Sequence, residues 1–446
     1  MKILMLSWEY PPRVVGGIAR VVSELSERLT EKGHDVTVVT YRDGDLEYKE
    51  KINGVTVYRV DNYMIRPQNF IDWIMQLNFN MISKASELIN AGEKFDVIHA
   101  HDWLTCYAAK TLKHSYNIPL TVTIHATENG RNSGIHTEQQ RYINDTEWLL
   151  TYESDEVIVN SNFMKTEVQR LFNLNYDKVK VIPNGIDLEK FDGFERDYTF
   201  RRNYASDNEK IIFTLGRLVN EKGIQHLICA MPKIISQYND VKLVIGGRGP
   251  MIDELKDLAY RIGVAHKVYF TGFLSGDNVQ KMYKCADIAV FPSTYEPFGI
   301  VVLEAMLAKV PAVVSDIGGL NEIIEHNVDG VKSYAGNANS LADAILSILF
   351  DKSLEEKIVD NADKKVRELF NWEKIAEMTQ DVYEEAINCS SKNRYEEKVE
   401  NEQIIEKLEG VEKKGSILEK LTEEKDFLDR IARTNKRMIT GDAMSN

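Results

Sequence analysis

Residues 296–304 read EPFGIVVLE, and they follow the short apolar run from Ile288 to Pro292. Phe298-Gly299 predicts a turn after a strand, and the apolar residues behind it predict the start of a buried helix. The same order of strand, turn and helix recurs along most of the chain, where short β-branched runs alternate with longer segments of helical period. This alternation is typical of βαβ units with mostly parallel sheets, so we predict an α/β fold.

The 446 residues are too many for one ordinary core, and they favour two α/β domains with a cleft between them, plus an appendage. The break at Pro183-Asn184-Gly185 and the polar stretch after it separate two series of strands. We therefore predict Rossmann-like domains over residues 1–195 and 196–365, a helix over 366–389 that packs back on the first domain, and a charged helical tail over 390–446. The predicted strands are Lys2 to Trp8, Asp35 to Tyr41, Val55 to Val60, Asp96 to His101, Leu120 to His125, Glu156 to Asn160, Lys178 to Ile182, Ile211 to Gly216, Leu243 to Gly246, Val268 to Gly272, Ile288 to Pro292, Ala312 to Ser315 and Gly330 to Ser333.

Composition excludes several classes of protein. A formal charge of −14 argues against a protein that coats nucleic acid, because phosphate binding needs an excess of Lys and Arg. The four cysteines form no C-x-x-C pair, so neither a disulfide framework nor a zinc knuckle is indicated. The apolar run at the N-terminus is interrupted too early for a signal peptide or a membrane span. We expect a cytoplasmic protein with no transmembrane segment.

The tail beyond Cys389 is dense in Glu and Lys, with apolar residues at helical or heptad-like spacing and two glycines between them. Two interpretations fit this pattern. The tail is either a pair of solvated helices or a coiled-coil arm that mediates oligomerisation or docks a partner.

Two glycine-containing loops leave predicted strands and enter helices. At Gly16-Gly17 a phosphate or sugar can approach bare backbone amides, although the pair also suits a simple tight turn. The segment from Gly216 to Gly223 lacks the G-K-[ST] ending of a P-loop. It places Arg217 and Lys222 where they can grip a diphosphate, the alternative being two ordinary surface cations.

The two carboxylates of the opening segment occupy different settings. Glu296 lies in the predicted loop, and Glu304 lies inside the following helix among apolar residues. The N-terminal end of a helix favours anions, so both side chains can be simple dipole complements. A buried Glu304 nevertheless requires a partner, because an unpaired buried charge is unfavourable.

These segments together resemble the retaining GT-B glycosyltransferases of family 4 and the related bacterial and archaeal glycogen synthases. The resemblance runs from Lys2 to about Tyr383. Its motifs appear in the family's order: SWEYPP with Gly16-Gly17, His101-Asp102-Trp103, Thr123-Ile124-His125, Pro183 to Asp187, Gly216-Arg217 with Lys222-Gly223, and Glu296 to Glu304 in the E-x7-E spacing. The resemblance implies two Rossmann-like α/β/α domains that face each other across a cleft.

The resemblance also implies roles for individual residues. The positions of Arg217 and Lys222 neutralise the departing nucleotide diphosphate, and the Gly16-Gly17 loop closes over the phosphates from the other domain. Glu296 corresponds to the glutamate that holds hydroxyls of the donor sugar, and Glu304 to the one that binds the ribose. Further implied members are Phe298 and Gly299 in the donor site, His125 beside the reacting sugar, and His101 and Asp102 on the acceptor side.

One position departs from the pattern of the glycogen synthases, and one segment matches a metal-binding motif of another kind. Glycogen synthases carry a lysine two residues before the glycine pair, where this chain has Val14. This difference favours the broader family over a dedicated glucan synthase. Asp43-Gly44-Asp45 matches a D-x-D metal motif but follows a strand in a polar stretch, so we interpret it as a turn. With no convincing cluster of metal ligands, we expect neither a metal nor another cofactor.

We therefore predict a metal-independent, retaining hexosyltransferase. Its expected donor is a nucleotide-sugar such as ADP-glucose or UDP-glucose, and its expected acceptor is a glycan hydroxyl, such as the end of a growing α-1,4-glucan. Alternatives are a family 4 transferase with a lipid- or cell-envelope-linked acceptor, a nucleotide-sugar epimerase on the same fold, and a catalytically silent sugar-nucleotide sensor. Donor turnover, with and without acceptor, distinguishes these alternatives.

Overall fold

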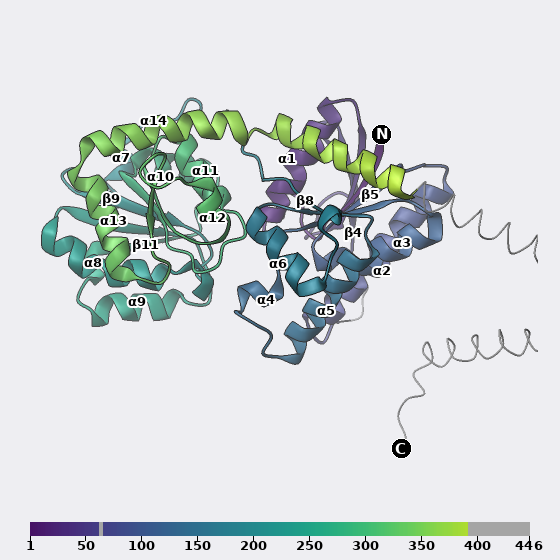
Figure 1. The fold of residues 1–446 in the computed structure, drawn as a ribbon, viewed down its shortest axis with the longest axis horizontal. Coiled ribbons are helices and arrows are strands. Elements are labelled where there is room, and N and C mark those ends of the chain that lie inside the picture. The colour runs from purple at the N-terminus through teal and green to yellow at the C-terminus, as the bar shows by residue number, and fades with distance from the viewer. Residues whose placement is uncertain (62–65, 391–446) are drawn as a thin grey trace, which may run out of the picture. The chain divides into compact units, whose positions relative to one another are not determined.

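The computed structural model describes residues 1–61 and 66–390. Within them the chain forms two separate β-sheets, each with helices on both faces (Figure 1). The α/β fold class with two parallel-sheet domains is confirmed. The predicted tail over 390–446 lies outside the described residues from position 391 onward.

The first sheet has the strand order β3-β4-β2-β1-β5-β6-β7-β8. Its neighbours pair in parallel except β3, which is antiparallel to β4. The strands are β1 Lys2–Leu6, β2 Asp35–Tyr41, β3 Lys49–Ile52, β4 Val55–Val60, β5 Val97–His101, β6 Leu120–Ile124, β7 Glu156–Val159 and β8 Val179–Val181. The helices that follow these strands are α1 Gly17–Glu31, α2 Phe70–Asn90, α3 Cys106–Tyr116, α4 Glu128–Arg131, α5 Glu138–Glu153 and α6 Asn162–Phe172.

The second sheet is parallel throughout, with the order β11-β10-β9-β12-β13-β14. Its strands are β9 Lys210–Leu215, β10 Val241–Gly246, β11 Val268–Gly272, β12 Ile288–Phe291, β13 Ala312–Ser315 and β14 Val331–Ser333. Its helices are α7 Tyr198–Arg201, α8 Ile224–Gln237, α9 Ile252–Arg261, α10 Asn278–Cys285, α11 Ile300–Leu307, α12 Gly318–Ile323, α13 Ala338–Phe350 and α14 Lys352–Leu369. In both sheets the order reverses on either side of the first strand, and ligands of such folds bind at the carboxyl ends of the strands near that reversal.

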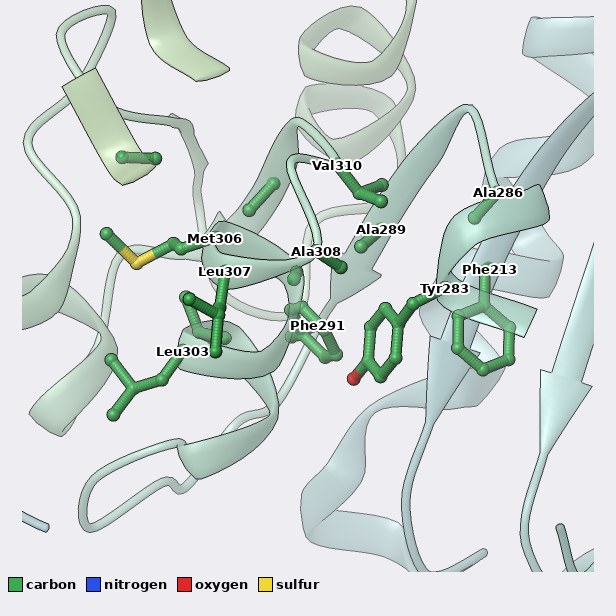
Figure 2. Packing of buried hydrophobic residues seen from close by; sticks show 14 of the residues in the cluster. Phe213, Tyr283, Ala286, Ala289, Phe291, Leu303, Met306, Leu307, Ala308 and Val310 are labelled. Carbon is green, nitrogen blue, oxygen red and sulfur yellow. The ribbon is translucent and has the colours of Figure 1, made fainter. Parts of the chain in front are cut away.

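Two apolar clusters sandwich each sheet. In the second sheet, one face packs on α8 and α13, and the other packs on α10 and α11. Figure 2 shows part of this second face, where Tyr283 of α10 lies beside Phe213 of β9. Their ring centroids are 5.1 Å apart in an edge-to-face arrangement, a favourable geometry for aromatic pairs. This packing fixes the position of the Tyr283 hydroxyl, which donates a hydrogen bond to Glu304.

Residues 372–390 form a helix after α14. Trp372, Ile375 and Tyr383 from this helix share an apolar cluster with Ile3 and Met5 of β1, so the helix packs on the first sheet. The chain therefore passes from the second sheet back to the first near residue 371. There the Ile186 N–H donates a 2.7 Å hydrogen bond to the carbonyl oxygen of Phe370. The segment that leads from the first sheet to the second is thereby bonded to the segment that returns.

The predicted strands agree with the observed ones to within two residues at either end. The sequence prediction missed β3, because Lys49-Glu50-Lys51-Ile52 is a polar edge strand without apolar alternation. Asp43-Gly44-Asp45 lies in the turn between β2 and β3, and Asp43 forms a 2.9 Å ion pair with Arg13.

Candidate active site

A pocket of about 560 Å³ lies where residues of both sheets meet. Its walls come from the loops after β1, β5 and β6 of the first sheet and after β9, β10 and β12 of the second. Of the site residues predicted from sequence, those that line this pocket are Gly16, Gly17, Asp102, His125, Arg217, Lys222, Glu296, Phe298, Gly299 and Glu304. His101 lies behind His125 and has no exposed surface.

The loop after β1 is held by the buried carboxylate of Glu9. Its Oε2 accepts hydrogen bonds from the backbone N–H groups of Val15 and Gly16, the latter at 3.1 Å. Burial raises the pKa of Glu9, and the backbone hydrogen bonds oppose that rise. Some amides of the glycine loop are thus already occupied by Glu9. Gly17 faces the start of α11, since a Cβ atom there would lie 3.7 Å from Cδ1 of Ile300.

Arg217 and Lys222 follow β9, as the sequence predicts. Lys222 ends a short 3-10 turn, and its Nζ lies 2.6 Å from Oε2 of Glu296. The Ser293 hydroxyl donates to the same oxygen at 3.2 Å. The Arg217 side chain is half-exposed and only 3.5 Å from a Glu221 oxygen. Two cations thus stand at the pocket wall, one of them aligned by Glu296.

Gly223 allows the loop after β9 to lie close to the end of β12. It adopts a left-handed conformation with φ +66°, and a Cβ atom there would lie 1.9 Å from the carbonyl oxygen of Pro292. Only glycine fits such a position, because the added atom would collide with backbone that cannot move aside. The β9 loop therefore packs directly against the end of β12.

Glu304 is completely buried, and its partners come from three separate segments. Its Oε1 lies 2.9 Å from Nη1 of Arg20 on α1 and also accepts a hydrogen bond from Lys190, while Tyr283 donates to Oε2 at 3.1 Å. Burial would raise the pKa of Glu304, but the charges of Lys190 and Arg20 outweigh it and lower the pKa. The partner that a buried Glu304 requires is therefore a pair of cations and a phenol.

His125 directly follows β6 at the pocket and is held by two contacts. Its backbone N–H donates to Oδ1 of Asp102 at 2.7 Å, and its Nε2 lies 3.1 Å from Nδ1 of His101. Asp102 has a positive φ of 58°, which is uncommon outside glycine and often marks functional sites. Burial lowers the pKa of His125 and lowers that of His101 well below its usual range, which favours the neutral form of both rings.

The tautomers of these rings follow from their partners. Nε2 of His101 is buried and has no hydrogen-bond partner among the described residues. An orphaned N–H donor is rarer and less favourable than an orphaned acceptor, so the proton belongs on Nδ1 of His101, which donates to Nε2 of His125. His125 then carries its own proton on Nδ1.

Several residues of the site had no signal in the sequence. Arg20, Lys190 and Tyr283 contact Glu304 across long separations in the chain, and Arg131 lines the pocket beside His125. Only the apolar surroundings of Glu304 indicated that it needs a partner, and they did not identify it.

Tyr295 connects the loop after β12 to residues that follow strands of the first sheet. Its hydroxyl donates to Oε1 of Glu167 at 2.8 Å and accepts the Thr127 N–H at 3.3 Å. A Cβ atom at Gly130 would lie 2.3 Å from the Tyr295 ring, so this position needs glycine. Burial raises the pKa of Tyr295, which keeps the phenol protonated as a donor.

Within residues 1–61 and 66–390, no group of three or more His, Cys, Asp or Glu side chains is arranged to hold a metal ion. None of the helices in those ranges is long and apolar enough to cross a membrane.

The chain is similar to known glycosyltransferases. Residues 15–190 match the family described as Glycosyltransferase Family 4, and residues 196–365 match Glycosyl transferases group 1. An uncharacterized glycosyltransferase of Methanocaldococcus jannaschii is 47% identical over 391 residues, covering 87% of this chain and 99% of the relative. Glycogen synthase of Mycobacterium tuberculosis is 34% identical over 398 residues, covering 86% and 94%. The solved structure of sucrose-phosphate synthase from Thermosynechococcus elongatus superposes with a TM-score of 0.74 at 25% identity, covering 86% of this chain and 98% of that one.

Proposed function

This chain belongs to the family 4 glycosyltransferases of the GT-B fold, and we propose that it transfers glucose from ADP-glucose or UDP-glucose to the end of a growing α-1,4-glucan. The transfer retains the anomeric configuration and needs no metal ion. The likeness to glycogen synthase over most of both chains supports this acceptor. Val14, in place of the glycogen-synthase lysine, leaves a lipid- or cell-envelope-linked acceptor as the alternative.

One observation carries the proposal. Lys222 is held 2.6 Å from Glu296 at the wall of a pocket that the half-exposed Arg217 also lines. In glycosyl transfer, the leaving diphosphate gains negative charge while the anomeric carbon becomes cationic. Cations fixed beforehand on the protein stabilise that diphosphate without reorganising during the reaction. To Glu296, on the same wall, we assign the role of holding the hydroxyls of the sugar.

The residues around the pocket favour front-face attack by the acceptor hydroxyl. Oε2 of Glu296 contacts Lys222 and Ser293, and Oδ1 of Asp102 accepts the His125 N–H, so one oxygen of each carboxylate is committed to the protein and we assign neither as a covalent nucleophile. The Nδ1–H of His125 is available to the sugar as a hydrogen-bond donor. The diphosphate itself then accepts the proton of the attacking hydroxyl.

The test is a matrix of donors and acceptors. The purified protein is incubated with ADP-glucose, UDP-glucose and other nucleotide-sugars, each with glycogen, with lipid acceptors and without acceptor, in the presence and absence of a chelator. We expect glycogen-dependent release of nucleotide diphosphate that the chelator leaves unchanged, with an α-linked product by proton NMR. A β-linked product, strict metal dependence or isomerised donor without transfer would contradict the proposal.

A further inference from the structure

Arg20 links helix α1 to Glu304 of α11. Its Nη1 lies 2.9 Å from the Glu304 Oε1 atom, and the contact joins the two sheets across the pocket. The two members of this pair differ in their surroundings. The Arg20 side chain is 48% exposed, whereas the Glu304 side chain is 0% exposed. Arg20 can therefore leave the pair for water or for a ligand, while Glu304 cannot.

Both oxygens of Glu304 are occupied in this structure. Oε1 accepts from Arg20 and Lys190, and Oε2 accepts from the Tyr283 hydroxyl. Because these partners leave the Glu304 side chain 0% exposed, a ribose diol that binds this carboxylate has to displace one of them. Tyr283 is completely buried and Lys190 is mostly buried, so releasing either would strand a polar group inside the protein. Arg20 is the partner that can be displaced at the lowest cost.

The position of Arg20 gives its released guanidinium a destination. Arg20 lies in the first turn of α1, directly behind the Gly16-Gly17 loop, and lines the same pocket as Arg217 and Lys222. A planar guanidinium binds two phosphate oxygens at once, which a lysine ammonium does not.

We propose that Arg20 is a further donor-binding residue with two positions: it pairs with Glu304 as in this structure, and with the diphosphate when the ribose takes Glu304. This inference rests on the proposed function, in which Glu304 binds the ribose. It predicts that the two parts of the donor are coupled. A nucleoside alone displaces Arg20 without giving it a new partner, whereas a nucleoside diphosphate supplies one.

Arg20→Met separates the two contributions. Dissociation constants are measured by calorimetry for ADP and UDP, and for adenosine and uridine, with wild type and variant. We expect the variant to bind its preferred nucleoside diphosphate about 10- to 100-fold more weakly, the value of one hydrogen bond to a charged group. Its affinity for the matching nucleoside should be unchanged or higher, because Glu304 no longer has to be released from Arg20.

Two further variants complete the experiment. Arg28→Met is the matched control, since Arg28 lies on the same helix, pairs with Glu31 at 2.7 Å and is 35% exposed; it should bind all four ligands like wild type. Arg20→Lys keeps the charge without the planar fork and should recover part of the lost diphosphate affinity. A thermal melt verifies that each variant is folded.

The outcomes are distinguishable. If Arg20→Met weakens nucleoside and nucleoside diphosphate by the same factor, Arg20 only orders Glu304 and the inference is wrong. Unchanged diphosphate affinity would equally overturn it. If wild type binds no nucleoside diphosphate at all, the proposed function itself fails, before any comparison with the variant.

Discussion

Lys222→Met tests the electrostatic core of the proposed site. The substitution keeps most of the apolar stem and removes the ammonium group that lies 2.6 Å from Glu296. Losing one preorganised contact to a developing anion raises a transition-state barrier by about 3 kcal/mol. At about 1.4 kcal/mol for each factor of ten, kcat/KM for the donor should fall roughly 100-fold.

The same substitution affects stability, and the structure indicates how much. The Lys222 side chain is 25% exposed and that of Glu296 is 10% exposed, so the pair lies between a surface and a buried salt bridge. Removing one partner of a fully buried pair costs about 3–5 kcal/mol, and exposed pairs contribute about 0–1 kcal/mol. An intermediate loss of about 2 kcal/mol is expected here, since the Ser293 hydroxyl still donates to Glu296.

Steady-state rates are therefore measured well below the melting temperature of the variant, so that unfolding does not contribute. Lys233→Met is the matched control on α8, because Lys233 forms a 2.6 Å pair with Asp343 and is 32% exposed, away from the pocket. It should lose a little stability and no activity. If Lys222→Met kept kcat/KM within about threefold of wild type, no transition-state role could be assigned to this lysine.

Four other substitutions have defined expectations. Gly223→Ala should lower the melting temperature and donor affinity together, because its φ of +66° alone costs a side chain about 1–2 kcal/mol and the new Cβ meets the Pro292 carbonyl; wild-type values for both would contradict this. Glu296→Gln should chiefly lower kcat, and Glu304→Gln should chiefly raise the donor KM, since the ribose does not change charge during transfer; steady-state constants for both variants decide, and the reverse pattern would mean that the donor lies the other way round. Burial raises the pKa of Glu156 from 4.5 to about 7. Between these pH values the carboxyl is still protonated in the folded state but ionised in the unfolded state, so the folded state loses stability as the pH rises. Glu156→Gln should accordingly raise the melting temperature clearly at pH 8 and much less at pH 5, and an equal gain at both pH values would show that ionisation is not the cause.

The sequence predicts the fold well because buried parallel strands have a strong local signal. Short runs such as Val36 to Thr40 and Val313 to Ser315 are apolar or β-branched almost throughout, as strands covered on both faces must be. The edge strand β3 has one face open to solvent and carries Lys49 and Glu50, so periodicity could not find it. Its existence depends on pairing with β4, a tertiary contact rather than a local preference.

The residues of the candidate site likewise include some with a local sequence signal and some without one. Residues at the ends of strands and in glycine loops, such as Lys222 and His125, are recognisable because their motifs are local. Arg20 and Lys190 converge on Glu304 from positions 284 and 114 residues away in the chain. A single sequence contains no signal for such pairings, although the burial of Glu304 required some cation to be present.

The buried histidines bear on which group accepts the proton in the proposed transfer. Burial lowers the pKa of His125 and of His101 behind it. Nε2 of His101 has no partner within the described part of the chain, which places the His125 proton on Nδ1. A neutral ring with its one free edge protonated can donate a hydrogen bond to the sugar but cannot take the acceptor's proton there. One oxygen each of Asp102 and Glu296 is likewise committed to the protein, which is consistent with the proposal that the leaving diphosphate takes the proton. Arg217 and Lys222 would then control both its departure and its basicity.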